Sequence, residues 1–441
     1  MSKRLLYAAV ADDDTGASDL AGMFADTGAR VVLVLDVPPP ADLERWTEQA
    51  YGVVFATATR AQSRDTAYTK TAEAVRAALS LDPQTVQVKY CSTFDSTEQG
   101  NIGPSIDAAL DETGEEFTIA LPALPVNGRT TYNGYHFVKG VLLSDSPMRF
   151  HPMTPMTNSD LVSWLGLQTS RRVGLTPYAV VEQGAAAIER HWSTLRADGV
   201  SISIVDCLKD EHAAAICEAA CSLRVISGGS AFGTHLPPAW TRRHWFTPDR
   251  SGAFEDLEIE PGRGALVVAG SCSTATAAQN EAFTAHGAET IQVDARDLIE
   301  RGLGSGVDAA AGVLRAGGSV LLKTRSSLDD IECARSWGLE QGWDSSSLGL
   351  RIADELASAV RAVVEAQRPS VLISAGGETS SAVCRKLGIR ALAVGRNIQP
   401  GVPMCLPMEG PAIPVVLKSG NFGTPDFYER AIEAASKLSH G

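Results

Sequence analysis

Near its N-terminus the chain reads Leu5-Leu-Tyr-Ala-Ala-Val-Ala-Asp-Asp-Asp-Thr-Gly-Ala-Ser-Asp19, a short apolar run that ends in three adjacent carboxylates. The run Leu5–Val10 predicts a first buried strand, because it is apolar and has the length of a strand. The polar residues after it are typical of the loop between a strand and a helix. In open α/β sheets ligands collect at this end of the strands, so we expect a functional site to include Asp12 and Asp13.

The rest of the chain alternates short β-branched runs with Ala-rich helical stretches, which is typical of parallel sheets covered by helices. We expect strands at Leu5–Val10, Val31–Leu35, Gly52–Ala56, Val86–Cys91, Phe117–Leu121, Ser201–Val205, Ala265–Ala269, Thr290–Val293, Ser319–Leu322 and Ser370–Ser374. We expect helices at Ser63–Leu79, Ala185–Arg196, Glu211–Ser222, Thr274–His286, Ile352–Gln367 and Ser380–Leu387. The predicted fold class is therefore α/β.

The length of 441 residues exceeds one ordinary hydrophobic core. We expect two domains, each a largely parallel sheet covered by helices, with the active site in the cleft between them. The segment His235–Gly264 holds four prolines and has no regular period, which indicates a connector. The expected division is an N-terminal domain over residues 1–235, a connector over residues 236–262 and a C-terminal domain over residues 263–441.

Composition excludes several classes of function. The formal net charge of −14 makes nucleic acid and anionic membranes poor partners. The N-terminal apolar run is too short for a signal peptide, and no run reaches the length of a membrane span. The eight cysteines are scattered and the eight histidines form no metal-ligand spacing, so we expect reduced thiols, a cytoplasmic location and no catalytic zinc. Homo-oligomerisation is left open.

The acidic loop at residues 12–14 has two interpretations. In the first it is an N-terminal helix cap, with Thr15 or Ser18 as the capping residue and surplus solvated acid. In the second, one aspartate accepts the proton of a substrate hydroxyl while another orients it. We expect Asp13 and Asp95 both to be needed for turnover, take Asp13 as the base and keep Asp12 and Asp95 as alternatives for that role.

A second polar loop, Lys89–Gly103, follows the fourth expected strand. Lys89, Asp95, Ser96 and Asn101 suit a polyhydroxylated acid, with the lysine facing its carboxylate and the others its hydroxyls. An ordinary helix cap is the alternative.

A third loop, Pro122–Thr131, follows the fifth expected strand. Gly128 permits a turn that presents Arg129, whose guanidinium can bind a carboxylate through two hydrogen bonds. A surface turn with an ordinary arginine is the alternative.

Glycine- and hydroxyl-rich turns mark the C-terminal half: Gly270-Ser-Cys-Ser-Thr274, Ala375-Gly-Gly-Glu-Thr-Ser380 and Lys418-Ser-Gly-Asn-Phe-Gly423. Each follows a strand, where free N–H groups and a helix dipole favour an anion. Three such turns in one domain favour a nucleotide site, although none matches a P-loop. The glycines of Gly302-Leu-Gly-Ser-Gly306 follow a helical run, so we discount them as a dinucleotide motif.

Together these segments resemble the four-carbon acid sugar kinase family over nearly the whole chain. The resemblance rests on Ala11–Asp19, Asp95–Thr97, Gly100–Gly103, Asn127–Thr131, Gly376–Thr379, Pro400–Pro403 and Lys418–Gly423. Lys89–Thr97, Pro122–Arg129, His151–Thr157 and the ending Lys418–Gly423 look most like the 3-oxo-tetronate 4-kinase branch. The resemblance implies an ATP-dependent kinase that phosphorylates the C4 hydroxyl of a four-carbon sugar acid, with threonate or erythronate as alternative substrates.

The resemblance also implies a division of labour between the domains. ATP would be bound in the C-terminal domain by Ser271, Gly376, Gly377, Glu378, Thr379 and Gly420, and its phosphate charge would be neutralised by Mg²⁺ and cations. The anionic sugar acid would be bound in the N-terminal domain by Asp12, Asp13, Arg60, Lys89, Asp95, Ser96, Asn101 and Arg129. Which acid holds Mg²⁺ is left open.

Two positions depart from the family pattern. Asp14 stands where members often have an apolar or aromatic residue, and Gln99 stands where many have arginine. The second change fits the oxo-tetronate branch. Two other classes are disfavoured: a nicotinamide-dependent dehydrogenase would need a glycine fingerprint after a strand, and a sugar-acid-binding protein without catalysis would need export.

Overall fold

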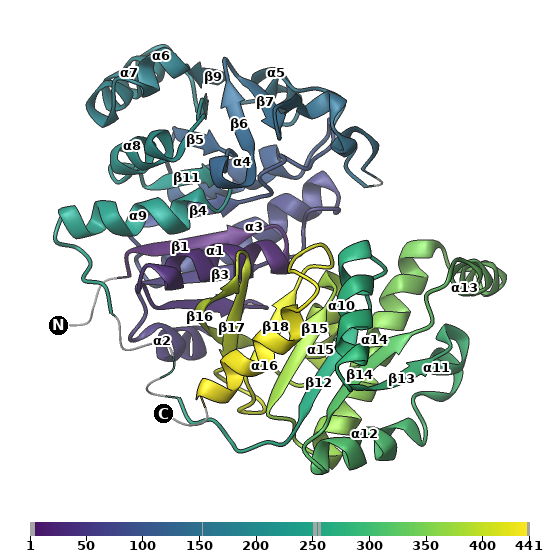
Figure 1. The fold of residues 1–441 in the computed structure, drawn as a ribbon. Coiled ribbons are helices and arrows are strands. Elements are labelled where there is room, and N and C mark those ends of the chain that lie inside the picture. The colour runs from purple at the N-terminus through teal and green to yellow at the C-terminus, as the bar shows by residue number, and fades with distance from the viewer. Residues whose placement is uncertain (1–4, 152, 250–253, 255–256, 439–441) are drawn as a thin grey trace. The chain divides into compact units, whose positions relative to one another are not determined.

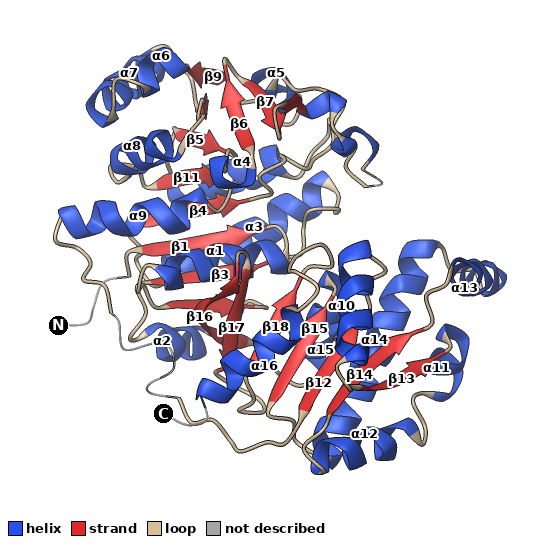
Figure 2. Cartoon of the chain, viewed as in Figure 1, coloured by secondary structure: helices blue, strands red, loops and turns tan. Residues whose placement is uncertain are grey.

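The computed structural model describes residues 5–151, 153–249, 254 and 257–438. It divides into two compact units, Met1–Gly252 and Ala253–Gly441. Figure 1 shows a sheet with helices in each unit, and Figure 2 separates its helices, strands and loops. The α/β class and the two-domain arrangement are confirmed.

The first unit is built on a parallel sheet with strand order β2-β3-β1-β4-β11-β5-β10-β9. Its strands are β1 Tyr7–Ala11, β2 Val31–Val34, β3 Gly52–Ala56, β4 Thr85–Lys89, β5 Thr118–Leu121, β9 Val173–Thr176, β10 Ile202–Val205 and β11 Val225–Gly228. Its helices are α1 Asp14–Asp26, α2 Pro40–Thr47, α3 Arg64–Leu79, α4 Ile102–Thr113, α5 Leu161–Gly166, α6 Tyr178–Val181, α7 Ala185–Ala197, α8 Asp210–Ala220 and α9 Ala231–Arg242. Strands β1 and β4 are neighbours, so the loops after them, which carry Asp12 and Asp95, start at the same edge of the sheet.

A small antiparallel sheet, β6-β7-β8, is added to this unit, and the sequence did not predict it. Its strands are β6 Arg129–Tyr132, β7 Tyr135–Val138 and β8 Val141–Leu142, flanked by the 3₁₀ turns Pro125–Asn127, Leu143–Asp145 and Pro147–Phe150. Both hairpins turn through two residues with positive φ, Asn133-Gly134 and Lys139-Gly140. This backbone conformation suits the twist of a tight β-hairpin.

The second unit has the strand order β13-β14-β12-β15-β18-β17-β16, parallel as far as β18 and antiparallel beyond it. Its strands are β12 Ala265–Ala269, β13 Glu289–Val293, β14 Ser319–Thr324, β15 Val371–Ala375, β16 Ala391–Gln399, β17 Val402–Pro407 and β18 Val415–Lys418. Its helices are α10 Thr274–Ala285, α11 Ala295–Arg301, α12 Gly306–Arg315, α13 Leu328–Glu340, α14 Ser345–Ala366, α15 Gly377–Lys386 and α16 Phe427–Leu438. Strands β12, β15 and β18 are adjacent, so the three glycine-rich turns begin side by side.

The predicted strands and helices are confirmed, with most ends displaced by only one or two residues. The largest difference is α14, which begins at Ser345 rather than Ile352. The expectation of an irregular connector from residue 236 is wrong at its start, because residues 236–242 complete α9, with Pro237 and Pro238 inside the helix. The connector residues 250–253, 255 and 256, and Pro152 of the motif His151–Thr157, lie outside the described residues.

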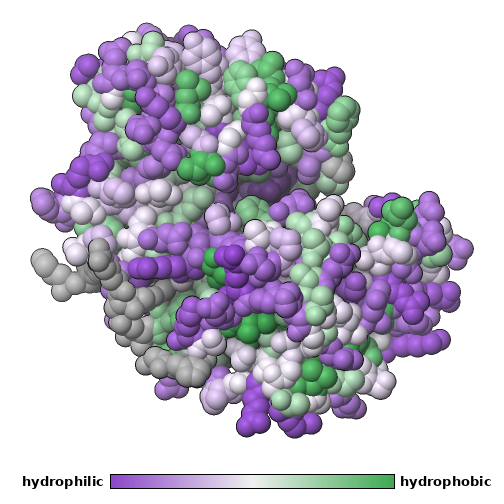
Figure 3. All heavy atoms as spheres, in the orientation of Figure 1, coloured by the Kyte–Doolittle hydropathy of each residue, from purple (hydrophilic) through white to green (hydrophobic). Residues whose placement is uncertain are grey.

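The surface drawn in Figure 3 is mostly hydrophilic, and hydrophobic residues form small separate patches on it. None of the helices in the described ranges combines the length and the apolar character that a membrane span requires.

Candidate functional site

The acidic loop after β1 begins helix α1, and Asp13 is its N-cap. The Asp13 carboxylate accepts hydrogen bonds from the Gly16 N–H and from the Thr15 hydroxyl, the latter at 3.1 Å. The expectation that Thr15 or Ser18 caps the helix is therefore wrong. Asp13 takes the cap because its extended backbone directs its side chain back onto the first turn.

Asp12 is held by Arg60 through a two-point ion pair. Arg60 Nε and Nη2 lie 3.0 and 2.8 Å from the two oxygens of Asp12, whose side chain is only 6% exposed. Asn101 Nδ2 donates a third hydrogen bond to Asp12 at 3.3 Å. Burial raises the pKa of Asp12, and the attraction of Arg60 offsets this only in part. The carboxylate of Asp12 is thus occupied by protein groups.

Asp13 has a different environment, although it lies beside the same guanidinium. Its Oδ1 is 3.4 Å from Arg60 Nη2, and its side chain is 27% exposed. Burial would raise its pKa, but Arg60, the Gly16 N–H, Lys89 and Thr15 together lower the pKa below its ordinary value. Asp13 is therefore ionised at neutral pH and accessible to a ligand.

Lys89 completes this cluster from the end of β4. Its side chain is buried, its Nζ donates to the Tyr90 carbonyl at 3.1 Å, and its charge acts on Asp12, Asp13 and Asp19. A Cβ on Gly16 would lie 3.1 Å from Lys89 Nζ and 2.8 Å from Asp13 Oδ1. Glycine at position 16 therefore leaves the space between these charged groups open.

Asp19 belongs to the same cluster, and sequence reasoning did not assign it. It accepts a hydrogen bond from the Ser230 hydroxyl at the start of α9, and burial raises its pKa. A signal was present in the sequence: Asp19 lies four residues after Thr15 in α1, and so on the same helical face.

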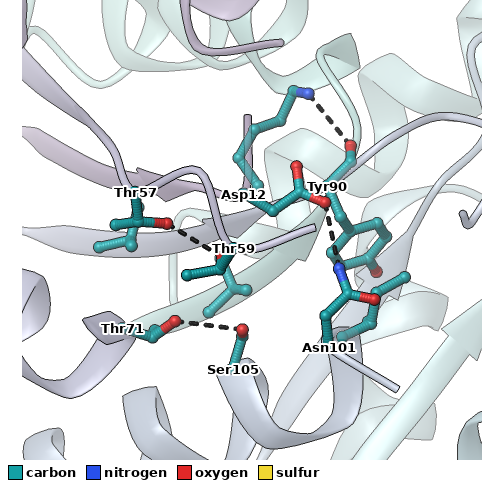
Figure 4. Close-up of a pocket in the computed structure, with 11 residues that line it drawn as sticks. Asp12, Thr57, Thr59, Thr71, Tyr90, Asn101 and Ser105 are labelled. Carbon is teal, nitrogen blue, oxygen red and sulfur yellow. Dashed lines mark hydrogen bonds between the residues drawn. The ribbon is translucent and has the colours of Figure 1, made fainter. Parts of the chain in front are cut away.

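A cavity of about 10 Å³ is lined by Asp12, Thr57, Thr59, Thr71 and Asn101 together with apolar side chains (Figure 4). Such a volume holds one water molecule at most and cannot accept a sugar acid. The Oδ1 atom of Asn101 is buried and has no hydrogen-bond partner among the described residues.

Asp95 lies in the loop after β4, apart from the Arg60 pair. Its side chain is 5% exposed and accepts a hydrogen bond from the Thr93 hydroxyl at 2.6 Å. Asp95 and Arg60 both act electrostatically on Cys91, but no ion pair or hydrogen bond in the described part of the chain joins Asp95 to Asp12 or Asp13. Asp95 is a neighbour of the charged cluster rather than part of it.

Ser96 is not placed as we expected. It is fully buried, its hydroxyl donates to the Phe94 carbonyl at 2.9 Å, and it accepts from Trp164 Nε1 and Gln168 Nε2, both at 3.0 Å. One donor and two acceptor positions are the whole capacity of a hydroxyl. The Ser96 hydroxyl is therefore fully occupied by protein groups, and its contacts hold the loop against α5.

Arg129 opens β6 directly after the positive-φ turn at Gly128, as the sequence predicts. Its Nη1 donates to the Asn127 carbonyl at 2.7 Å, and its Nε is buried without a partner among the described residues. Nearby His136 is buried, and burial, with a smaller effect of Arg129, lowers its pKa to about 4. His136 is therefore neutral and does not compete with Arg129 for an anion.

In the second unit the three glycine-rich turns are linked by backbone hydrogen bonds. The N–H groups of Gly270 and Ser271 donate to the Ala375 carbonyl at 3.1 and 3.2 Å, and the Gly376 N–H donates to the Lys418 carbonyl at 2.8 Å. Ser271 lies close to Gly420, since a Cβ on that glycine would be 2.1 Å from Ser271 Oγ. The predicted residues of all three turns are thus brought together.

Helix α15 has an N-terminus suited to an anion. Its N-cap is Gly376, with φ of +128°, and no side chain caps its first turn. The first N–H groups of a helix have no intrahelical acceptor, and together with the helix dipole they attract a phosphate. Gly377, Glu378 and Thr379 form this first turn; Glu378 is exposed, whereas Thr379 is buried against Gly270.

Two family models match the chain. The model of a sugar-binding N-terminal domain matches residues 7–236, and the model of a nucleotide-binding C-terminal domain matches residues 266–428.

Relatives match at full length. The chain is 36% identical over 435 residues to a 3-oxo-tetronate kinase of Cupriavidus necator, covering 98% of each chain. It is 37% identical over 440 residues to a 3-oxo-tetronate kinase of Burkholderia multivorans, again covering 98% of each. The crystal structure of a Haemophilus influenzae protein has a TM-score of 0.77 at 30% identity and covers 97% of this chain and 99% of that one.

Proposed function

Since the chain belongs to the four-carbon acid sugar kinase family, in its 3-oxo-tetronate 4-kinase branch, we propose that it uses ATP to phosphorylate the C4 hydroxyl of 3-oxo-tetronate. The observation that carries this proposal is the full-length similarity to 3-oxo-tetronate kinases, which spans a sugar-binding and a nucleotide-binding domain. The charged cluster of the first unit and the linked turns of the second supply chemistry suited to the two ligands. The domain limits of 1–235 and 263–441 remain part of the proposal.

In the first unit, Asp13 is the residue that we propose to receive the proton of the C4 hydroxyl. It is ionised and more exposed than Asp12, whose two oxygens are taken by Arg60 and Asn101. Asp12 then acts by holding Arg60 beside Asp13. Asp95 is the alternative base, although its contact with Thr93 and its burial leave it less accessible.

Arg129 and Lys89 are the cations that we propose for the substrate carboxylate. The unpartnered Nε of Arg129 favours this assignment, because a buried donor without an acceptor is costly. The charge of Lys89 also acts on three aspartates, so Lys89 offsets their repulsion of the anionic substrate in addition to attracting its carboxylate.

In the second unit, the phosphates of ATP are proposed to bind at Ser271, Gly420 and the first turn of α15. Mg²⁺ neutralises charge on the transferring phosphoryl group. The described residues hold no group of three or more His, Cys, Asp or Glu able to cage a metal. A nucleotide-bound Mg²⁺ needs only one or two carboxylates besides the phosphates, and Glu378 is the carboxylate that the three turns offer.

Substitution of Gly420 tests the nucleotide site. In Gly420→Ala the new Cβ would lie 2.1 Å from Ser271 Oγ and 3.0 Å from its Cβ, so the Ser271 side chain must be displaced from the turn. We expect the Kd for ATP to rise about tenfold or more, with unchanged affinity for the sugar acid, as measured by calorimetry. Gly312→Ala is the matched control, because a Cβ there meets nothing within 4 Å. Loss of sugar-acid binding with retained ATP binding would reverse the assignment of ligands to domains.

The substrate is tested by direct competition. We expect 3-oxo-tetronate to be phosphorylated with kcat/KM at least about tenfold above that of threonate or erythronate. The reason is that a donor aimed at a ketone oxygen is left unpaired by a carbinol. Gln99, an exposed amide where many relatives have arginine, and Asn101 are the donors that we propose.

ADP release and ³¹P NMR give the readouts of this competition. Preferred turnover of threonate would place the enzyme in another branch of the family. Binding of sugar acids without ADP release would favour the alternative of a binding protein. We also propose a cytoplasmic location, which the eight free cysteines support.

A further inference from the structure

Lys418, the last residue of β18, is fully buried at the nucleotide turns. Its Nζ lies within hydrogen-bond distance of four oxygens: the carbonyls of Ser419, Gly420 and Phe422 at 3.0, 3.2 and 3.2 Å, and the Thr276 hydroxyl at 3.3 Å. No carboxylate is among these partners. Burying an ammonium group among neutral oxygens, with no carboxylate partner, costs free energy of folding. A functional role of Lys418 would explain why a charged residue occupies this buried position.

Side chains of α10 and of its N-cap residue also donate hydrogen bonds to these carbonyls. The hydroxyls of Ser273 and Thr276 donate to the Gly420 carbonyl at 2.6 and 2.9 Å, and Gln279 Nε2 donates to the Phe422 carbonyl at 2.9 Å. The carbonyls of residues 419–422 that bind Lys418 therefore face the protein interior.

Because the peptide unit is planar and trans, carbonyls that face inward place the N–H groups of the same peptide units outward. In each peptide unit the N–H points opposite to the C=O. Carbonyls of Ser419 and Gly420 that face inward therefore turn the N–H groups of Gly420 and Asn421 outward, next to Ser271. No residue in the described part of the chain accepts from either N–H. Successive outward N–H groups form a nest that binds phosphate oxygens.

We propose that Lys418 is a positioning residue, which builds the phosphate nest of Gly420 and Asn421 by holding the carbonyls of this turn inward without contacting the nucleotide itself. The ligand class is a nucleotide polyphosphate, and the inference rests on the proposed function. Burial lowers the pKa of Lys418 to about 8, so the group is mostly protonated at pH 7 and can donate three hydrogen bonds.

The test compares Lys418→Met with the wild type by calorimetry, using ATP, inorganic pyrophosphate and adenosine. In the variant the carbonyls lose their donor and the turn rearranges. We expect the Kd for ATP and pyrophosphate to rise about tenfold or more, while that for adenosine changes less than about twofold. Equal loss for all three ligands would indicate general damage to the domain and overturn the proposal.

Hydrogen exchange without nucleotide separates positioning from direct contact. The Phe422 N–H bonds to the Ser419 carbonyl at 3.2 Å, so its protection reports whether the turn keeps its shape. We expect protection of Phe422 to fall in Lys418→Met. Unchanged protection combined with weaker ATP binding would mean that Lys418 contacts phosphate directly, and the proposal would fail.

Two further variants control for the loss of a positive charge and for a failure of Lys418→Met to fold. Lys437→Met removes one positive charge from an exposed pair with Glu433 and is expected to leave ATP affinity unchanged. Should Lys418→Met not fold, Thr276→Val removes one anchor of the Gly420 carbonyl and should weaken pyrophosphate binding to a smaller extent; unchanged binding would overturn the proposal. If the wild type binds pyrophosphate but not ATP, the phosphate nest is supported and the proposed kinase function is refuted. If it binds neither ligand, both proposals are refuted.

Discussion

Asp13→Asn is expected to lower kcat about 10²–10⁴-fold, the usual cost of removing a general base, while leaving the Kd for ATP unchanged. The substitution is well suited to the question, because asparagine caps a helix about as well as aspartate. The bond from the Gly16 N–H is therefore kept, and α1 should remain intact. What is lost is the negative charge beside Arg60, 3.4 Å away, and the capacity to accept a proton.

The measurement is a steady-state assay of ADP release, with thermal unfolding to verify the fold. Asp14→Asn is the matched control: it removes the same charge one residue along the chain, at a position to which no catalytic role is assigned, and should keep kcat within about threefold. Near-normal turnover of folded Asp13→Asn would remove Asp13 from the mechanism and direct attention to Asp95.

Arg60→Met is expected to destabilise the first unit by about 3–5 kcal/mol at neutral pH, the cost of breaking a buried ion pair from one side. The variant leaves the Asp12 carboxylate, 6% exposed, without its two-point partner. Urea unfolding followed by circular dichroism measures the loss.

The destabilisation should depend on pH. Without Arg60 the pKa of Asp12, which burial already raises, rises further above its ordinary value of 3.8. Between that value and the raised pKa, the folded variant binds a proton that the unfolded chain does not, so its free energy of unfolding falls as pH rises. The pKa of Asp13, which Arg60 helps to lower, moves in the same direction. The deficit relative to wild type should thus be larger at pH 8 than at pH 5.

Arg76→Met serves as the matched control for this pH dependence. Arg76 pairs with Glu112 at 3.1 Å, but its side chain is 58% exposed, so the loss should stay below about 1 kcal/mol and vary little with pH. A pH-independent deficit in Arg60→Met would contradict the assignment of the effect to Asp12.

The fold could largely be predicted because buried parallel strands and Ala-rich helices have distinct sequence periods. Several elements, among them β9, β11, β16 and β17, were not predicted, and two regions show why. The start of β6 was interpreted as part of a loop and β7 and β8 were not predicted, although Asn133-Gly134 is a strong hairpin signal. The prolines at 237 and 238 suggested a connector, yet α9 continues through them to Arg242.

The site was harder to predict, because sequence places a side chain on a loop but does not give its direction. Asp12, Lys89 and Arg129 were predicted to lie at the ends of strands, and the structure places them there. It could not show that the Ser96 hydroxyl turns inward to Trp164 and Gln168, since that orientation depends on packing against a helix some 65 residues later. Lys418 escaped for the same reason: only the folded turn reveals that its ammonium is surrounded by carbonyls.

The inward-facing carbonyls of the turn at residues 418–422 also determine which of its positions depend on the identity of the side chain. A surface that presents main-chain N–H groups is indifferent to the side chains carried by the same residues. The exposed side chains of Asn421 and Phe422 should therefore contribute little to phosphate binding itself, whereas a side chain at position 420 would displace Ser271. Phosphate binding at this turn thus depends on the geometry of its peptide units rather than on the side chains of its exposed residues.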